Sequence, residues 1–152
     1  MSARKKKSKR QSDSNFIIEK KQHERLTFFL DRALGKRIIV ESLSEQNPEI
    51  TVKVLEDYFE SNVVDEEWLR FVGQKGWIAI TKDKRIRYRS PALEVIGKEK
   101  VKLFVLNKGN LTGFEMAEII KRAIPRIKTF IARHEPPFIA KITKSGKIVK
   151  AK

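Results

Sequence analysis

Short apolar runs recur along the chain and alternate with segments in which apolar residues follow helical spacing. Apolar residues dominate 26–30, 77–80 and 101–106, whereas residues 50–54 alternate between apolar and polar. Continuous apolar runs are typical of strands covered on both faces, and alternation is typical of strands with one covered face. The pattern therefore predicts four strands in the first 106 residues.

The first helix is expected between the strands at 26–30 and 50–54. Leu34, Ile38 and Leu43 share one apolar side of this helix. The helix should end near residue 45, because Pro48 pushes the residue before it away from helical angles.

Two further helices are expected around the run at 77–80. The acids at 65–67 suit the positive end of a helix dipole, and Gly73 or Gly76 would end this helix. A short helix is expected within 91–98. Strands and helices then alternate along the chain.

The clearest helix signal begins at Thr112. Thr112 and Glu115 have the spacing of a capping box, in which each side chain bonds the other residue's backbone N–H. Apolar residues then follow helical spacing past Pro125, where a kink is expected. The residues after this helix predict a basic hairpin formed by 138–143 and 146–149.

Strands that alternate with helices favour right-handed βαβ units. We therefore expect an α/β fold with a mainly parallel sheet covered by helices. The length of 152 residues suits one domain, which we place at 26–143. Residues 1–15 are expected to form a disordered basic tail, and residues 144–152 a basic terminal strand or tail.

The amino-acid composition indicates which binding partners and which cellular compartment to expect. The chain has 34 Lys and Arg against 19 Asp and Glu, a net charge of +15, which favours polyanions such as RNA or DNA. It has no Cys, so disulfides and thiolate metal sites are excluded, and a cytoplasmic location is the default expectation. No apolar run is long enough to cross a bilayer, so no membrane role is expected.

Three acids occupy positions that a parallel sheet would bring together. Asp31 and Asp83 follow predicted strands, and Asp65 begins a predicted helix. Functional groups gather beyond the carboxyl ends of parallel strands, and carboxylates suit hard cations such as Mg²⁺ or Mn²⁺. Each acid also has a structural explanation: Asp31 and Asp83 can close turns, and Asp65 can be a helix N-cap.

A run of cations surrounds Asp83. Its members are Lys82, Lys84, Arg85, Arg87 and Arg89. Such residues can hold phosphates near a metal, with Tyr88 available to stack on a base, or they can form an ordinary solvated loop. The combination of acids and cations favours metal-dependent phosphodiester chemistry. No phosphate-binding P-loop or Gly-x-Ser-x-Gly motif is present.

Four segments together resemble the PIN-like domain superfamily, and specifically the compact VapC-type toxins of VapBC pairs. The segments are 28–31, 65–69, 76–83 and 109–113, and the apolar strand that ends in Thr-x-Asp is the most specific. The resemblance covers about 26–142. It implies a three-layer α/β/α fold and a Mg²⁺- or Mn²⁺-dependent ribonuclease that is neutralised by a small antitoxin protein and commonly forms a homodimer.

The resemblance also implies roles for individual residues. Asp31, Asp65 and Asp83 would be the catalytic metal ligands, with Thr81 and Asn110 shaping the site. Many members have a fourth acid on the helix between the first Asp and the acid-headed helix. In this chain, Glu41 and Glu45 lie on that helix. Glu66, which directly follows Asp65, is a substitute candidate.

Two functions from different classes follow. The first is an RNA-cleaving enzyme, and the second is a non-catalytic RNA-binding or adaptor module in which the acidic site is degenerate. The absence of a matching motif for the fourth acid favours the second. RNA binding is expected of both because of the net charge.

Overall fold

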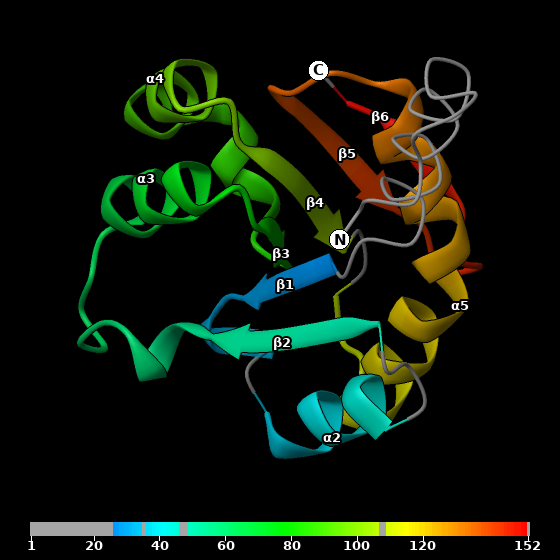
Figure 1. The fold of residues 1–152 in the computed structure, drawn as a ribbon. Coiled ribbons are helices and arrows are strands. Elements are labelled where there is room, and N and C mark those ends of the chain that lie inside the picture. The colour runs from blue at the N-terminus through cyan, green and yellow to red at the C-terminus, as the bar shows by residue number, and fades with distance from the viewer. Residues whose placement is uncertain (1–25, 35, 46–48, 107–108, 152) are drawn as a thin grey trace, which may run out of the picture.

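The computed structural model describes residues 26–34, 36–45, 49–106 and 109–151, so the tail expected at 1–15 lies outside the described residues. Figure 1 shows the strands and helices. The strands are β1 (Leu26–Leu30), β2 (Ile50–Val54), β3 (Ile78–Thr81), β4 (Lys102–Leu106), β5 (Phe138–Ile142) and β6 (Ile148–Lys150). The α-helices are α2 (Arg37–Glu45), α3 (Asp65–Lys75), α4 (Ser90–Lys98) and α5 (Gly113–Arg133). Short 3-10 helices are η2 (Arg32–Leu34), η3 (Leu55–Asp57) and η4 (Lys84–Tyr88).

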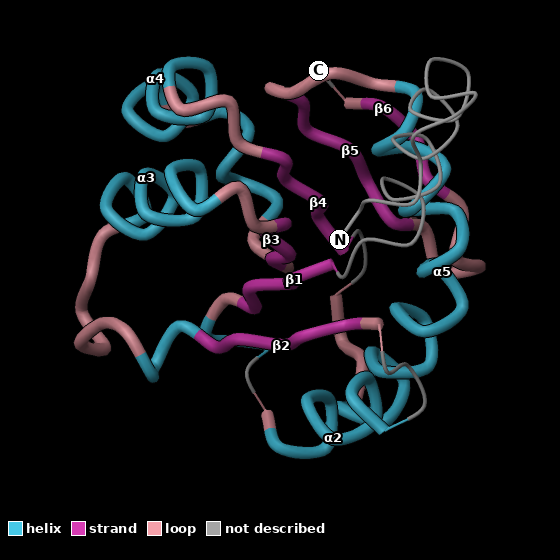
Figure 2. Tube along the Cα trace, viewed as in Figure 1, coloured by secondary structure: helices cyan, strands magenta, loops and turns pink. Residues whose placement is uncertain are grey.

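The described strands form one sheet in the order β2-β1-β3-β4-β5-β6. The strands from β1 to β5 run parallel, and β6 pairs antiparallel with β5. Helices α3 and α4 lie on one side of the sheet, and α2 and α5 lie on the other (Figure 2). The expected mainly parallel, three-layer α/β/α fold and the terminal hairpin are therefore confirmed.

Alternation along each central strand divides the core into two layers. In β1, Phe28 and Leu30 pack toward α2 and α5, whereas Phe29 packs toward α3 and stacks on Trp68 with ring centroids 5.8 Å apart. The side chains of Phe28, Phe29 and Leu30 are fully buried. A strand that is covered on both faces must be apolar at every position, which explains the continuous runs in the sequence.

One helix expectation needs correction. Ile38 was expected on the buried side of the first helix, but it is 46% exposed, and Ile39 faces the core instead. Leu34 belongs to the 3-10 helix Arg32–Leu34 and not to α2, which begins at Arg37, so its spacing to Ile38 does not indicate a shared helical face. Of the two glycines expected to end α3, Gly76 does so, because its φ of 73° lies in the left-handed region that favours glycine, whereas the helix continues through Gly73.

The capping box that begins α5 is confirmed. The Thr112 hydroxyl accepts from the Glu115 N–H at 3.1 Å, and the Glu115 carboxylate accepts from the Thr112 N–H at 2.9 Å. The helix then continues through Pro125 to Arg133. Among the described residues, no helix combines the length and the apolar character that a bilayer crossing requires.

Pairing of β1 with β3 brings the ends of two separate segments together. Leu30 is the register partner of Ile80, and the Asp31 N–H donates to the Ile80 carbonyl at 3.1 Å. Since these strands are parallel, the residues after them leave the sheet at the same edge. This edge carries Asp31 and Asp83.

Two helical glycines allow a test of the packing between α3 and the segment that joins α4 to β4. A Cβ on Gly73 would lie 2.7 Å from the Glu99 Cβ and 3.0 Å from the Val101 side chain, whereas a Cβ on Gly97 would meet nothing within 4 Å. Gly73→Ala should lower the free energy of unfolding by about 1–3 kcal/mol through overpacking. Gly97→Ala, the matched control, should raise it by about 0.5 kcal/mol through helix propensity. Urea unfolding of both variants checks this, and equal effects would contradict the packing described.

Candidate functional site

Asp31 is a buried acid directly after β1. Its side chain is held by two hydrogen bonds, from the Thr81 hydroxyl and from the Arg32 N–H, each at 2.6 Å. Burial raises the pKa of the Asp31 carboxyl above its ordinary value of 3.8, and the negative charge of Asp65 adds to the rise. The two hydrogen bonds and the charge of Arg32 lower the pKa and so offset part of this effect.

Thr81 connects two of the acids. This residue ends β3 and is fully buried. Its hydroxyl donates to Asp31 and accepts from the Asp83 N–H at 3.1 Å. A hydroxyl can donate one hydrogen bond and accept others, so a single side chain can hold both segments in place.

Asp83 caps the 3-10 helix η4. Its carboxylate accepts from the Arg85 N–H at 3.0 Å and from the Arg85 side chain at 3.2 Å. The cap explains why the chain turns here after β3. The turn also places Asp83 and Arg85 side by side at the edge of the sheet.

Asp65 lies in the first turn of α3, where Val64 is the N-cap and makes no side-chain capping bond. The N-cap explanation for Asp65 is therefore wrong. Its carboxylate instead accepts from the Trp68 indole N–H at 2.8 Å and forms an ion pair with Arg89. The Asp65 side chain is only 13% exposed, so this contact is partly shielded from water.

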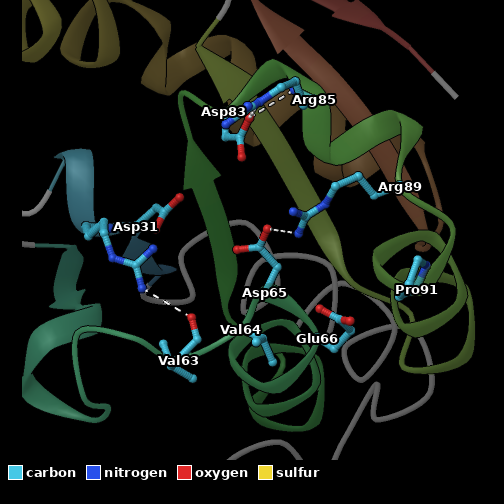
Figure 3. A pocket seen from close by; sticks show the side chains of 10 residues that line it. Asp31, Val63, Val64, Asp65, Glu66, Asp83, Arg85, Arg89 and Pro91 are labelled. Carbon is cyan, nitrogen blue, oxygen red and sulfur yellow. Dashed lines mark hydrogen bonds and ion pairs between the residues drawn. The ribbon is translucent and has the colours of Figure 1, made fainter.

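The three acids line one cavity of about 500 Å³. Figure 3 shows the carboxylates of Asp31, Asp65 and Asp83 around a common opening, with Arg89 reaching Asp65 and Arg85 reaching Asp83. The acids come from three separate segments of the chain. The cavity is lined by Asp31, Arg32, Val63, Val64, Asp65, Glu66, Asp83, Arg85, Arg89 and Pro91.

A second cavity, of about 430 Å³, adjoins the first at Asp31, Arg32, Asp83 and Arg85. Lys82 and Lys84 complete its lining. Cations are therefore present on the walls of both cavities. Acids that gather beside cations form a site where a negatively charged ligand and a positive ion can both be accommodated.

The donor set suits a hard divalent cation, but it is not arranged as a closed metal site. Carboxylate oxygens are the ligands that Mg²⁺ and Mn²⁺ prefer. Among the residues that the structure describes, however, no group of three or more His, Cys, Asp or Glu side chains is placed to hold a metal ion. Asp65 and Asp83 each bind an arginine instead.

The candidates for a fourth acid separate clearly. Glu66 lines the first cavity, although its carboxylate lies on the far side of Asp65 from the other two acids in Figure 3. Glu41 lies on the exposed surface of α2 and pairs with Arg37 at 2.7 Å. Glu45 is also exposed on α2, and neither residue lines a cavity described above. Geometry therefore favours Glu66.

Two of the predicted site residues, Arg87 and Asn110, lie outside both cavities. Arg87 lines neither cavity; its guanidinium donates to the Tyr88 hydroxyl at 2.9 Å and lies 5.0 Å from the centre of that ring. Asn110 is exposed and lines neither cavity. The structure thus brings the acids, Thr81, Lys82, Lys84, Arg85 and Arg89 together at one place.

Sequence reasoning missed Arg32. This residue lines both cavities, and its guanidinium donates to the Val63 carbonyl at 3.3 Å, which connects β1 to the segment before α3. Its position directly after Asp31 was the available signal. A cation beside a candidate acidic ligand could have been included with the basic loop.

One comparison with known proteins gave a match. A family model described as a PIN-like domain matches residues 26–108, which is more than half of the 152-residue chain. The matched segment contains β1 to β4 and all three acids. No curated protein and no solved structure matches the chain.

The buried carboxyl of Asp31 predicts a pH-dependent cost of folding. Because its pKa is raised in the folded state, the folded protein binds more protons than the unfolded chain as pH rises from 3.8, the ordinary value, through the folded pKa. The contribution of Asp31 to the free energy of unfolding therefore falls over that range and stays low above it. Asp31→Asn removes this dependence, so the variant should gain stability relative to wild type as pH rises.

Urea unfolding between about pH 4 and pH 8 measures this difference. Asp57→Asn, which changes an exposed acid on η3, is the matched control. A stability difference between wild type and Asp31→Asn that does not change with pH would contradict the assignment.

Proposed function

Because this chain belongs to the PIN-like domain family, we propose that it is a metal-dependent nuclease that hydrolyses phosphodiester bonds in RNA. One observation carries this proposal: three carboxylates from separate segments line a single cavity whose walls also carry arginines. Acids without cations would repel a nucleic-acid backbone. The net charge of +15 supports a polyanionic substrate.

Asp31, Asp65 and Asp83 would hold Mg²⁺ or Mn²⁺, with Glu66 as the candidate fourth ligand. A divalent ion held by these residues would supply a more acidic bound water and a positive charge near the phosphate. Asp83 and Asp65 form ion pairs with Arg85 and Arg89 in the structure. The same two carboxylates can therefore bind either an arginine or a metal ion.

The protein's own residues orient the reacting groups. Thr81 holds the Asp31 carboxylate and the backbone of Asp83, which limits the freedom of both. Arg32, Arg85 and Arg89 are available to bind phosphate oxygens at the cavity, since guanidinium groups can form paired hydrogen bonds with phosphate. Lys82 and Lys84 extend this positive lining into the adjoining cavity.

The finer assignment that we propose is a VapC-type toxin ribonuclease. It is supported by the motif at 76–83 and by the resemblance of 109–113 to the same subgroup. In this assignment the protein is cytoplasmic, is neutralised by a small antitoxin and forms a homodimer.

A second candidate function is a non-catalytic RNA-binding or adaptor module. The ion pairs of Asp65 with Arg89 and of Asp83 with Arg85 favour it, because they occupy two of the three acids. Such a protein would bind RNA equally well with a chelator and would yield no products. Metal dependence therefore separates the two candidates.

Purified protein should cleave RNA when Mg²⁺ or Mn²⁺ is present and should lose this activity with a chelator. Asp31→Asn and Asp83→Asn should each reduce cleavage by at least about 100-fold, because each removes a negative charge from the proposed ligand set. Labelled single-stranded RNA resolved on a gel measures the products.

Glu41→Gln is the matched control, because it removes an acid on α2 that lies outside the cavity. It should leave cleavage unchanged. Full cleavage by both aspartate variants would exclude the proposed site, and the absence of cleavage by wild type with either metal would favour the adaptor function.

Arg89 and a divalent ion should compete for Asp65. Arg89→Gln removes a positive charge beside this acid and is expected to raise Mn²⁺ affinity on the order of tenfold, since like charges no longer repel. Titration calorimetry with Mn²⁺ measures the change. Arg87→Gln is the control, because it removes the same charge from the same loop but from a residue that lines neither cavity.

The two variants give a clear contrast. A larger gain in Arg89→Gln than in Arg87→Gln supports a metal at Asp65. Equal affinities in both variants would contradict it.

A further inference from the structure

Cations also lie along the carboxyl edge of the sheet beyond the candidate site. Because β3, β4 and β5 are parallel neighbours, the segments that follow them leave the sheet at the same edge. Lys82 and Lys84 follow β3, and Lys144 and Lys147 lie in the turn between β5 and β6. Neighbouring strands are about 4.8 Å apart, so the end of β5 lies roughly 10 Å from the end of β3.

The turn between β5 and β6 is held by its own hydrogen bonds. The Gly146 N–H donates to the Thr143 carbonyl at 2.8 Å, and the Thr143 N–H donates to the Lys147 carbonyl at 2.9 Å. The Lys147 N–H also donates to the Thr143 hydroxyl at 3.1 Å. The backbone that carries Lys144 and Lys147 is therefore well defined, and both side chains are exposed.

Helix α5 adds two exposed arginines beside this turn. Gly146 has a φ of 88°, and a Cβ there would lie 3.1 Å from the Arg122 side chain, so glycine allows the close approach. The Arg126 guanidinium donates to the Gly146 carbonyl at 3.4 Å. We call Arg122, Arg126, Lys144 and Lys147 the turn cluster.

No acid among the described residues forms an ion pair with the turn cluster. Residues 136–152 contain no Asp or Glu. Within the described part of the chain, no ion pair involves a member of the cluster, and the nearby acid Glu118 on α5 pairs with Lys121 at 3.1 Å. Four cations that form no ion pair with a described residue produce, within a small region, a positive potential that attracts phosphates.

Protection of the sheet edge does not account for these lysines. Lysines on edge strands prevent unwanted strand pairing, and Lys150 in β6 suits that role. Lys144 and Lys147 lie in the turn before β6, where there is no strand edge to protect. Their position instead matches the edge to which the candidate site belongs.

Building on the nuclease function proposed above, we propose that the turn cluster binds the phosphate backbone of a single-stranded RNA whose cleaved segment lies in the acidic cavity. The strand then follows the carboxyl edge of the sheet, from the loop after β3 to the turn after β5. Contacts of this kind add affinity without reading the base sequence. The turn cluster therefore favours longer strands over short ones.

Fluorescence anisotropy with labelled RNA of about sixteen nucleotides, measured with a chelator at several salt concentrations, tests this contact. In single strands each neutralised phosphate contributes about 0.7 to the slope of log affinity against log salt, so Lys144→Ala/Lys147→Ala should reduce the slope by about 1.4.

Lys98→Ala/Lys100→Ala is the matched control. It removes the same charge from exposed positions between the end of α4 and the start of β4, at the opposite edge of the sheet. This control should retain the wild-type slope. Equal slopes in the two double variants, or an unchanged slope in the turn variant, would overturn the proposal.

Single-stranded DNA of the same sequence provides a second arm. An equal loss with DNA and RNA supports contact with phosphates, whereas a loss with RNA alone would assign the contact to the ribose and overturn the backbone assignment. Because binding is measured without metal, a failure to cleave RNA would refute the nuclease function without changing this result. Circular dichroism should show the same fold in every variant.

Discussion

The hydrogen bond from Thr81 to Asp31 is the interaction on which the candidate site depends. It joins the ends of β1 and β3 at 2.6 Å, and the same hydroxyl accepts from the backbone of Asp83. A buried carboxylate without partners would be strongly destabilising. The parallel pairing of β1 with β3 supplies the partner, so the sheet and the acidic site form as one unit.

The second constraint is the balance of charge at the cavity. Asp31 is buried with a raised pKa, whereas Asp65 and Asp83 are balanced by Arg89 and Arg85. Because two of the acids contact arginines, the cavity carries both negative groups that suit a metal ion and positive groups that suit a phosphate. This balance distinguishes the site from a group of carboxylates already arranged around a metal. It is compatible both with a metal-dependent nuclease and with a non-catalytic RNA-binding module.

Most of the fold could be predicted because local patterns reflect burial. Apolar runs predicted the central strands, and the Thr112–Glu115 spacing predicted the start of α5. The error at Ile38 has a physical cause: Leu34 belongs to the 3-10 helix after Asp31 and not to α2, and such short turns depend on contacts made elsewhere in the fold. The order of the strands in the sheet could not be predicted from hydrophobic periodicity either, because it depends on which strands pair.

The sequence by itself determined the element types, the excess of positive charge and the three acids that follow strands or begin a helix. These properties are local, because side-chain chemistry and hydrophobic spacing are written along the chain. Only the tertiary structure decided that Asp65 binds Arg89, that Arg32 lines the cavity and that Glu66 lies nearer the acids than Glu41 does. Those choices depend on how helices and loops pack across the sheet, and distances between remote residues are set only when the chain has folded.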